Sequence, residues 1–233
     1  MADSNELLRA EFNQWALEGR GEEMERDHLG VARQVIERMA LKPGERVLDL
    51  GCGTGWVTRL LAQAVEGGQG GQGMAAGVDL SEDMIARARA ASREVENVLF
   101  VAGSAAEIPW REEYFDRIFS LESFYYHPDQ EAVLRELHRV LVPGGLLYIA
   151  ISLYNENPHS LGWVDQLKVP VQVRSEAEYE RMLLAQGFAD VAIAHIPDLT
   201  EASGQYNGKC FASEEQWQEF RRIGALLLVA RRP

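Results

Sequence analysis

The chain has 233 residues, of which 36 are acidic and 23 basic, so the formal net charge is −13. This balance, with no basic run longer than two residues, argues against the cationic surface that a nucleic-acid-binding protein needs to displace counterions. Hydrophobic residues make up 46%, enough for a sizeable core, and no apolar run reaches the roughly 18 residues of a membrane span. The acidic, polar N-terminus and the two cysteines, Cys52 and Cys210, predict a cytoplasmic protein without a signal peptide or disulfide.

Two amphipathic segments come first, around residues 8–16 and 32–39, each with its apolar side chains on one helical face. Between them the stretch EGRGEEMERDH, residues 18–28, is polar and contains two glycines, which predicts a loop. We expect residues 1–41 to form a helical N-terminal cap over the mouth of a sheet built by residues 42–233.

Apolar runs of strand length then alternate with segments of helical period, which predicts an α/β fold with a mostly parallel sheet covered on both faces. The expected strands are residues 46–51, 74–80, 98–104, 115–123, 145–152, 190–196 and 224–231. The glycine-rich stretch GGQGGQG, residues 67–73, follows a helix and precedes a strand. That position is opposite the edge where α/β sheets bind ligands, so we interpret it as a flexible connector.

The stretch VLDLGCGTG, residues 47–55, carries the first strand into a glycine-rich turn, which predicts a nucleotide site. A dinucleotide fingerprint is G-x-G-x-x-G, but the third glycine here is Gly55, and Trp56 stands where close helix packing is required. This spacing disfavours a nicotinamide or flavin oxidoreductase. Asp49 lies in the middle of the strand, where an unpaired carboxylate is costly to bury. We expect it to accept hydrogen bonds from the amides of the glycine turn; the alternative is that it also faces an ammonium group of the ligand. Asp79 ends the second strand, where an acid binds both ribose hydroxyls.

In this order, VLDLGCGTG, GVDLSEDMI, GSAAEIPW, FDRIFSLES and VLVPGG resemble the motifs of class I S-adenosylmethionine (SAM)-dependent methyltransferases. The resemblance covers residues 45–152 and is nearest to the small-molecule subgroup with ubiquinone- and menaquinone-type enzymes. It implies a Rossmann-like three-layer sandwich whose seven-stranded sheet has its last strand antiparallel. It also implies transfer of a methyl group from SAM to a small-molecule acceptor, with S-adenosylhomocysteine (SAH) as product. The alternatives are a non-catalytic SAM-binding partner or sensor and an RNA or protein methyltransferase.

Carried over residue by residue, the resemblance implies a cofactor site along the glycine turn and the ends of the next strands. Its members are Asp49, Gly51, Cys52, Gly53, Gly55, Asp79, Leu80, Ser104, Ala105, Leu121 and Glu122. Ser104 stands where the family commonly has an acid for the adenine amino group, so we expect a weaker hydrogen bond there. Arg20 is a candidate partner for the cofactor carboxylate, the alternative being a solvated charge run.

The loop after the fourth strand, LESFYYHPD at residues 121–129, supplies the candidate catalytic residues Tyr126, His127 and Glu122. An aromatic ring beside a sulfonium is favourable by about 0.5–2 kcal/mol, and His127 is a candidate general base. The competing interpretation is that the tyrosine packs the loop onto the sheet and the histidine caps the next helix.

Two long segments, residues 153–174 and 199–222, are candidate substrate lids. We expect Tyr125, Tyr154, His159 and Trp163 to line the acceptor pocket, with Tyr206 and Trp217 on its other wall. The alternative for each aromatic ring is that it anchors its own loop. No metal site is expected, because neither the five histidines nor the two cysteines stand at ligand spacing.

Overall fold

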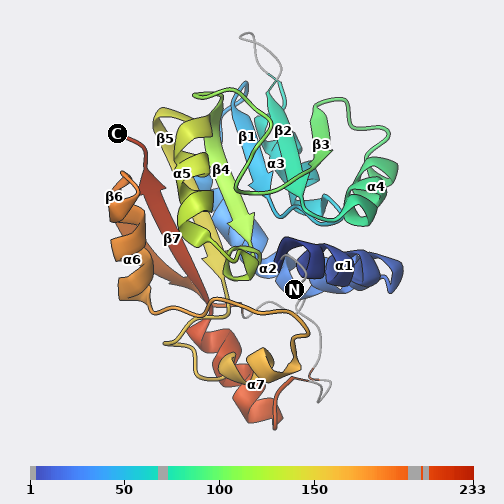
Figure 1. Cartoon of the computed structure of the whole chain (residues 1–233), viewed down its shortest axis with the longest axis vertical. Helices are drawn as coiled ribbons and strands as arrows, with labels where there is room; N and C mark the ends of the chain where they lie inside the picture. The colour runs from blue at the N-terminus through green and yellow to red at the C-terminus, as the bar shows by residue number, and fades with distance from the viewer. Residues whose placement is uncertain (1–3, 68–72, 199–205, 207–209) are drawn as a thin grey trace.

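The computed structural model describes residues 4–67, 73–198, 206 and 210–233. Its helices and strands alternate along the chain, and Figure 1 shows them as a central sheet between helices. In order, the elements are α1 (Ser4–Leu17), α2 (Arg20–Met39), β1 (Arg46–Leu50), α3 (Trp56–Val65), β2 (Met74–Asp79), α4 (Glu82–Ala91), β3 (Val98–Ala102), β4 (Phe115–Leu121), η1 (Phe124–Tyr126), α5 (Gln130–Val140), β5 (Leu141–Ile151), η2 (Leu161–Gln166), α6 (Glu176–Ala185), β6 (Ala189–Ile196), α7 (Glu214–Ile223) and β7 (Ala225–Arg231).

The seven strands form one sheet in the order β3-β2-β1-β4-β5-β7-β6. All neighbouring pairs are parallel except those of β7, which runs antiparallel to both β5 and β6. The predicted Rossmann-like sandwich, with its last strand antiparallel, is therefore confirmed. The order reverses between β1 and β4, which places a ligand crevice at the carboxyl ends of these strands.

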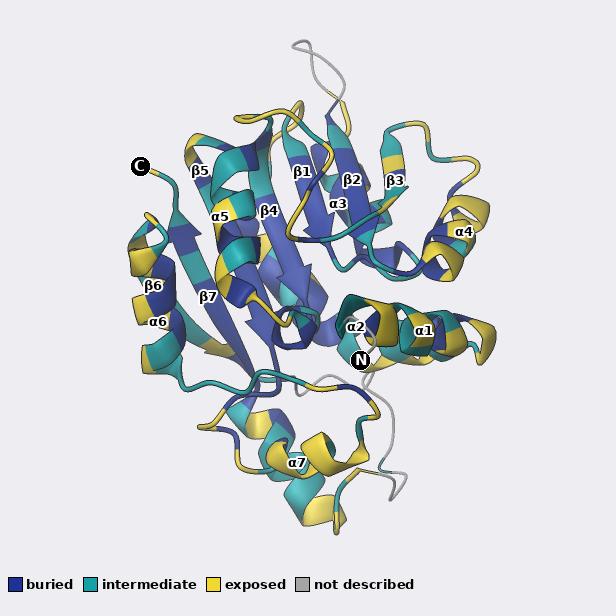
Figure 2. Ribbon diagram, viewed as in Figure 1, coloured by how far each residue is buried: buried dark blue, intermediate teal, exposed yellow. Residues whose placement is uncertain are grey.

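Alternating side chains of β1 belong to two separate cores, one on each face of the sheet. Leu48 and Leu50 pack with apolar residues of α5 and α6, whereas Val47 packs with those of α2 and α3. The central strands β1 and β2 accordingly appear mostly buried in Figure 2, whereas β3 at the edge of the sheet does not. Because a strand buried on both faces needs apolar side chains throughout, Asp49 in the middle of β1 has to be explained by the site.

The loop expected over residues 18–28 is wrong, because α2 begins at Arg20. The break between α1 and α2 consists of Glu18 and Gly19, and Gly19 takes a φ of 74°. The second glycine, Gly21, is buried inside α2, where a β-carbon would overlap the side chain of Thr54. This glycine therefore permits close packing of a helix onto the glycine turn and does not mark a loop.

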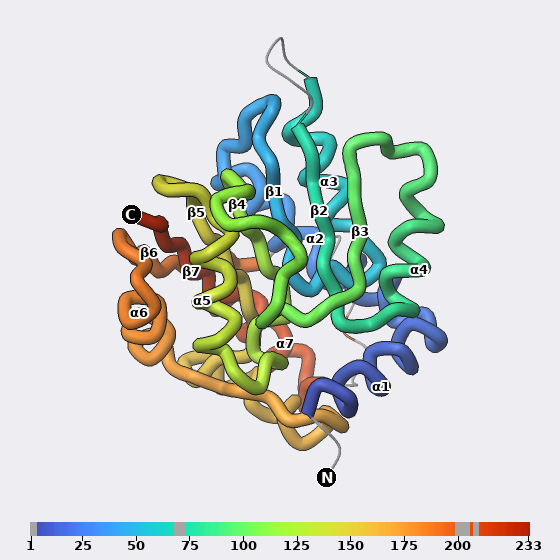
Figure 3. Tube along the Cα trace, turned by 45° about the horizontal axis from the view of Figure 1, so that its top comes forward, coloured from blue at the N-terminus to red at the C-terminus, as the bar shows by residue number. Residues whose placement is uncertain are grey.

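The first two helices lie in different places. α1 lies along the carboxyl-end side of the sheet next to α4 (Figures 1 and 3), whereas α2 inserts Val31, Ala32 and Val35 into the core on the α3 face. Only α1 therefore has the position of a cap.

The strand expected over residues 145–152 begins earlier, since α5 ends at Val140 and β5 begins at Leu141. The pairing with β4 shifts register between Phe115 and Arg117, and Gly144 takes a positive φ of 77°. Proline and glycine here mark a bulge instead of a chain reversal.

Several predictions fall on residues outside the described part of the chain. These are residues 68–72 of the connector and residues 199–205 and 207–209 of the second lid. Within the described ranges, no helix is long and apolar enough to cross a bilayer.

Candidate functional site

Two adjoining cavities open at the carboxyl ends of β1, β2 and β4, and Gly51 lines both. The larger, of about 270 Å³, lies between the ends of β2 and β3, the β4–α5 loop and α1. The smaller, of about 60 Å³, lies between the glycine turn, the start of α2 and the end of β4. Together they make the crevice expected at the point where the strand order reverses.

The glycine turn is built from three residues with positive φ: Gly51 at 73°, Gly53 at 50° and Gly55 at 75°. A β-carbon on Gly51 would overlap Ser123, and one on Gly55 would lie 2.6 Å from the Phe100 ring. At Gly53, by contrast, nothing lies within 4 Å of that position. Two glycines are thus required by packing, and the third leaves its backbone open to the cavities.

Asp79 lies on the floor of the larger cavity and is oriented by backbone amides. Its Oδ2 accepts a hydrogen bond from the Gly53 amide at 2.9 Å, and its Oδ1 accepts one from the Ser81 amide at 2.8 Å. Burial raises the pKa of this carboxyl despite those amides. Each oxygen keeps a lone pair for a ligand hydroxyl, so the geometry is suited to binding a diol.

Asp49 is 2% exposed and borders the smaller cavity. The Thr58 hydroxyl donates to its Oδ2 at 2.6 Å, and burial raises the pKa of Asp49 to about 7, with Asp79 adding to the effect. The glycine-turn amides do not bond this carboxylate among the described hydrogen bonds, so that part of the interpretation is not borne out. Thr58 of α3 takes their place. A nearby cation would stabilise the ionised form of a buried carboxyl whose pKa is raised, so this site favours a cationic group beside Asp49.

Glu122 is the second buried acid beside the smaller cavity, at 4% exposure and with φ 50°. Its Oε1 accepts the Ser152 hydroxyl at 2.6 Å, and its Oε2 accepts the Tyr125 hydroxyl at 3.1 Å. A non-glycine residue in the left-handed region is strained and is usually held by its surroundings. Here two hydroxyls from η1 and the end of β5 hold it.

Tyr126 faces the larger cavity and also packs beneath α1. Its ring meets Phe12 at 5.1 Å and Trp15 at 6.2 Å, both edge to face. Burial raises the pKa of Tyr126 and of its neighbour Tyr125, so both phenols stay protonated near neutral pH. They are hydrogen-bond donors, and neither is suited to act as a base.

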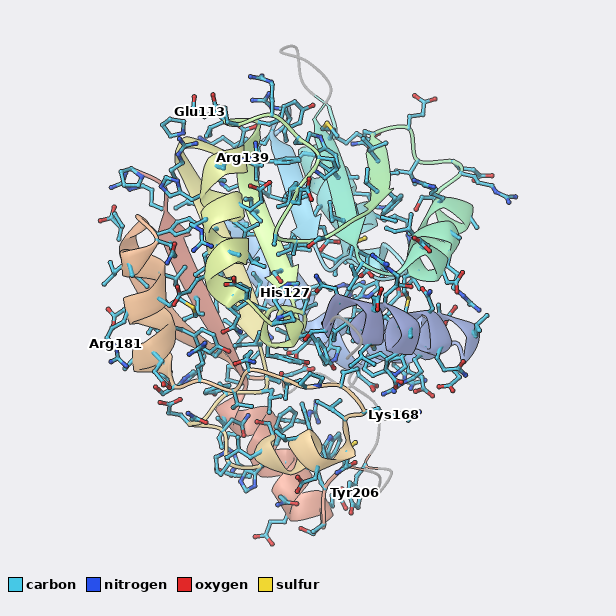
Figure 4. The ribbon with its side chains drawn as sticks, in the orientation of Figure 1. Glu113, His127, Arg139, Lys168, Arg181 and Tyr206 are labelled. Carbon is cyan, nitrogen blue, oxygen red and sulfur yellow. The ribbon has the colours of Figure 1, made fainter. Side chains whose placement is uncertain are left out.

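His127 lies at the wall of the larger cavity, where the β4–α5 loop meets α1 (Figure 4). It does not cap the next helix, because Asp129 does so by accepting the Ala132 amide at 2.8 Å. The Nε2 of His127 is buried without a hydrogen-bond partner among the described residues, and burial lowers its pKa to about 4. Its imidazole is therefore neutral and a weak base.

The remaining cofactor candidates lie at the two ends of the crevice. Leu80, Ser104 and Ala105 line the larger cavity, and Cys52 and Leu121 line the smaller. The Cys52 side chain also belongs to a small core with Phe100. The Ser104 hydroxyl accepts the Ala106 amide at 3.2 Å, so it also has a turn-forming role.

Arg20 lines neither of these cavities. Its guanidinium lies 3.8 Å from the centre of the Trp15 ring, at the first turn of α2. The next residue, Gly21, does border the smaller cavity. Arg20 is thus next in sequence to a residue of the site, and its guanidinium is held on the Trp15 ring by a cation–π contact.

The structure does not bring the acceptor-side candidates to these cavities, and Tyr125, which donates to Glu122, lines neither of them. Tyr154 is fully buried and donates to the Gly224 carbonyl at 3.2 Å, so its expected place in the pocket is wrong. His159 is half-buried and lines neither cavity. Trp163 packs 5.1 Å from Phe220 of α7.

Tyr206 and Trp217 lie on the second candidate lid, with ring centres 6.3 Å apart. The Tyr206 hydroxyl donates to the Phe211 carbonyl at 3.0 Å. The aromatic lid, which we define as Trp163, Tyr206, Phe211, Trp217 and Phe220, thus joins η2 to α7. Trp163 packs on rings of the other segment, Phe211 and Phe220, while Tyr206 and Trp217 pack within one segment.

Sequence reasoning missed residues that act through their neighbours. Thr58, Ser81 and Ser152 each donate a hydrogen bond to one of the three acids Asp49, Asp79 and Glu122. The N-cap position of Ser81 before α4 is a signal that was available. Nothing in the sequence marks Ser152 as the partner of Glu122, 30 residues away.

The SAM molecule implied by the resemblance fits this arrangement. The larger cavity has a diol-binding acid beside apolar and small residues, as ribose and adenine require. The smaller has two buried acids and the open face of Gly53, as an amino-acid moiety with an ammonium group requires. Across the described residues, no group of three or more His, Cys, Asp or Glu side chains is placed to hold a metal ion.

Comparison with known proteins agrees with this geometry. Residues 48–149 match the family model described as a methyltransferase domain. A methyltransferase in complex with the Haloferax volcanii Trm112 methyltransferase activator is 31% identical, with a TM-score of 0.85 over 96% of this chain and 98% of that one.

Curated relatives match over shorter stretches. The methyltransferase GfsG of Streptomyces halstedii is 35% identical over 162 residues, which are 63% of this chain and 54% of that protein. The demethylmenaquinone methyltransferase of Lysinibacillus sphaericus is 33% identical over 134 residues, 56% of this chain and 54% of that protein. The matched part of this chain thus spans about half the length of these relatives.

The full-length likeness to a methyltransferase, the matching domain and a crevice suited to SAM lead to one conclusion: this chain belongs to the class I SAM-dependent methyltransferases.

Proposed function

We propose that this chain transfers the methyl group of SAM to a small-molecule acceptor enclosed beneath α1. The observation that carries this proposal is the roof of the larger cavity. Leu8 and Phe12 of α1 line that cavity together with Asp79, so a helix of this chain forms part of the wall around the proposed transfer site. A folded protein or an RNA would have to displace this helix, whereas a small molecule fits under it.

The predicted cofactor residues take distinct parts in this proposal. Asp79 binds the ribose hydroxyls, and Leu80 with Ala105 contacts the adenine. Asp49 and Glu122 face the ammonium of the methionine moiety from two sides of the smaller cavity. Arg20 turns from Trp15 to the carboxylate, for which a guanidinium is the best-matched side chain.

When bound, SAM supplies a methyl group already activated by the charge of its sulfonium sulfur. The protein therefore has to align an acceptor and exclude water more than it has to remove a proton. Tyr126 presents a protonated phenol and an aromatic face beside that charge. His127, neutral and without a partner, accepts a hydrogen bond from an acceptor hydroxyl or amine and so orients it.

The test is methyl transfer from SAM carrying a labelled methyl group, with pools of extracted metabolites, tRNA and total protein offered separately. We expect label in the small-molecule fraction, lost in Asp79→Ala and kept in Asp83→Ala, an exposed acid on the same strand–helix unit. Label in RNA or protein would refute the small-molecule acceptor. Tight SAH binding without transfer to any pool would favour the sensor alternative.

A second proposal concerns a protein partner. Because the Haloferax volcanii relative matches over nearly its whole length and is in complex with an activator, we propose that this chain also binds a small activator protein. Size-exclusion chromatography with Trm112 from that organism tests this directly. Co-elution supports the proposal, and separate elution at micromolar concentrations of both proteins contradicts it.

A further inference from the structure

The roof and the floor of the larger cavity are joined by a short chain of hydrogen bonds. On the roof, Oδ1 of Asn13 in α1 accepts the hydroxyl of Ser81 at 2.6 Å and the Asp83 amide at 3.4 Å. Ser81 is fully buried and also caps α4, where its Oγ accepts the Met84 amide at 3.0 Å. α1 is thereby attached to the first turn of α4.

The same serine reaches the ligand site through its backbone. The Ser81 amide donates to Oδ1 of Asp79 at 2.8 Å, and the other oxygen of Asp79 accepts the Gly53 amide at 2.9 Å. Asn13, Ser81 and Asp79 therefore form a continuous path from the roofing helix to the carboxylate predicted to bind the ribose. No apolar packing intervenes along this path.

A two-residue break, Glu18 and Gly19, connects α1 to α2. Gly19 takes the left-handed conformation with φ 74°, and α2 is anchored in the core of the α3 face. On its inner side α1 is held by Phe12 and Trp15 against Tyr126, and on its α4 side by Asn13. Leu8 and Ala16 of the same helix are buried in the core with Tyr126 and Met84, so α1 is held by apolar packing as well as by the Asn13 hydrogen bond.

We propose that Asn13 is a positioning residue that couples occupancy of the ribose site at Asp79 to closure of α1 over the cofactor. A ligand diol that orders Asp79 also orders the Ser81 amide and hydroxyl, and so strengthens the attachment of Asn13. A closed α1 in turn slows the escape of the ligand, because linkage between two sites is reciprocal. This inference rests on the proposed function in one respect, that the crevice binds SAM or SAH.

The test uses the full chain, with SAH as the probe, and three variants of α1. Asn13→Ala removes the acceptor oxygen, and Asn13→Asp keeps one in the same place. Gln14→Ala is the matched control, since the Gln14 amide donates to Glu18 on the exposed side of the helix. SAH dissociation is followed by stopped-flow displacement, and closure of α1 by hydrogen exchange of its backbone amides with and without SAH.

In Asn13→Ala we expect the dissociation rate constant of SAH to rise about three- to tenfold, the effect of one lost hydrogen bond. We also expect SAH to lose its ability to slow exchange in α1. Asn13→Asp and Gln14→Ala should behave as the wild type. A wild-type dissociation rate in Asn13→Ala, or unchanged protection of its α1 by SAH, overturns the proposal, as does an equal effect in Gln14→Ala.

The outcomes also separate this proposal from the proposed function. SAH requires no acceptor, so coupling seen without methyl transfer to any small molecule would refute the proposed function alone. Transfer to a small molecule with no effect of Asn13→Ala would refute the coupling alone. A wild-type chain that binds neither SAM nor SAH would refute both.

Discussion

The cofactor crevice and the aromatic lid are held together in different ways. In the crevice, Asp79 accepts hydrogen bonds from two backbone amides, and Asp49 and Glu122 accept them from hydroxyls. In the lid, Trp163 and Phe220 are held by ring-to-ring packing, with centres 5.1 Å apart. Figure 2 shows the same contrast, with buried strands at the crevice and partly exposed segments around α7.

Polar groups show the difference most clearly. Each carboxylate of the crevice has a partner, whereas in the segment of residues 153–174 both amide atoms of the buried Asn157 and the indole nitrogen of Trp163 have none among the described residues. A buried polar atom without a partner costs about 1–3 kcal/mol. The carboxylates of the crevice are therefore pre-organised, whereas these polar atoms, like Nε2 of His127 at the wall of the larger cavity, have hydrogen bonds left to make.

Among substitutions that test this comparison, Gly51→Ala should have the largest effect on stability. A β-carbon there would overlap Ser123, and alanine would have to adopt a φ of 73°. We expect the free energy of unfolding in urea to fall by about 3 kcal/mol or more.

Gly53→Ala is its control. Nothing lies within 4 Å of that added carbon, so we expect only about 1 kcal/mol of destabilisation but weaker SAH binding. Equal destabilisation by the two variants would show that backbone strain, and not packing, governs the turn.

Asp79→Ala comes next in expected size. Loss of a charged hydrogen bond to the ribose should weaken SAH binding by about 1–3 kcal/mol in calorimetry. Asp83→Ala, in the exposed first turn of α4, should not change it. Unchanged affinity in Asp79→Ala would mean that the ribose is bound elsewhere in the crevice.

The buried Asp49 predicts a pH effect on the ligand-free protein. Its pKa is raised from 3.8 to about 7 on folding, so between these values the folded chain binds a proton that the unfolded chain has released. Stability contributed by this group is then lost as pH rises, and lowering the pH from 6.5 to 5.5 should increase the free energy of unfolding by about 1 kcal/mol.

Asp49→Asn provides the comparison for that measurement. Its urea midpoint should change less than that of the wild type between pH 6.5 and 5.5, and the difference between the two profiles isolates Asp49. Parallel profiles for both proteins would show that this carboxyl is ionised in the folded state throughout the range.

Among these variants, Trp163→Ala should have the smallest effect on cofactor affinity. Since Trp163 lines neither cavity, we expect SAH affinity to change less than about twofold, while the KM for the acceptor rises. A large loss of SAH affinity in calorimetry would show that the lid and the crevice are one cooperative unit.

The sequence by itself determined the seven strands, the positive-φ glycines of the turn and the acids Asp49 and Asp79. Each of these depends on short-range rules: alternation of apolar residues along a strand, the need for glycine where φ is positive, and the cost of an acid in a buried strand. Each of these rules acts on a pattern of a few neighbouring residues, so the features can be predicted without knowledge of the tertiary structure.

Only the tertiary structure decided which side chains meet. Asn13 and Ser81 lie 68 residues apart in the chain and form a hydrogen bond of 2.6 Å. The helix α2 continues through Gly21, which lies against the side chain of Thr54. Tyr126 and Tyr154 both follow a strand, yet one faces the larger cavity and the other donates to the Gly224 carbonyl in the core. Contacts between distant segments depend on how whole layers pack, and no local pattern carries that information.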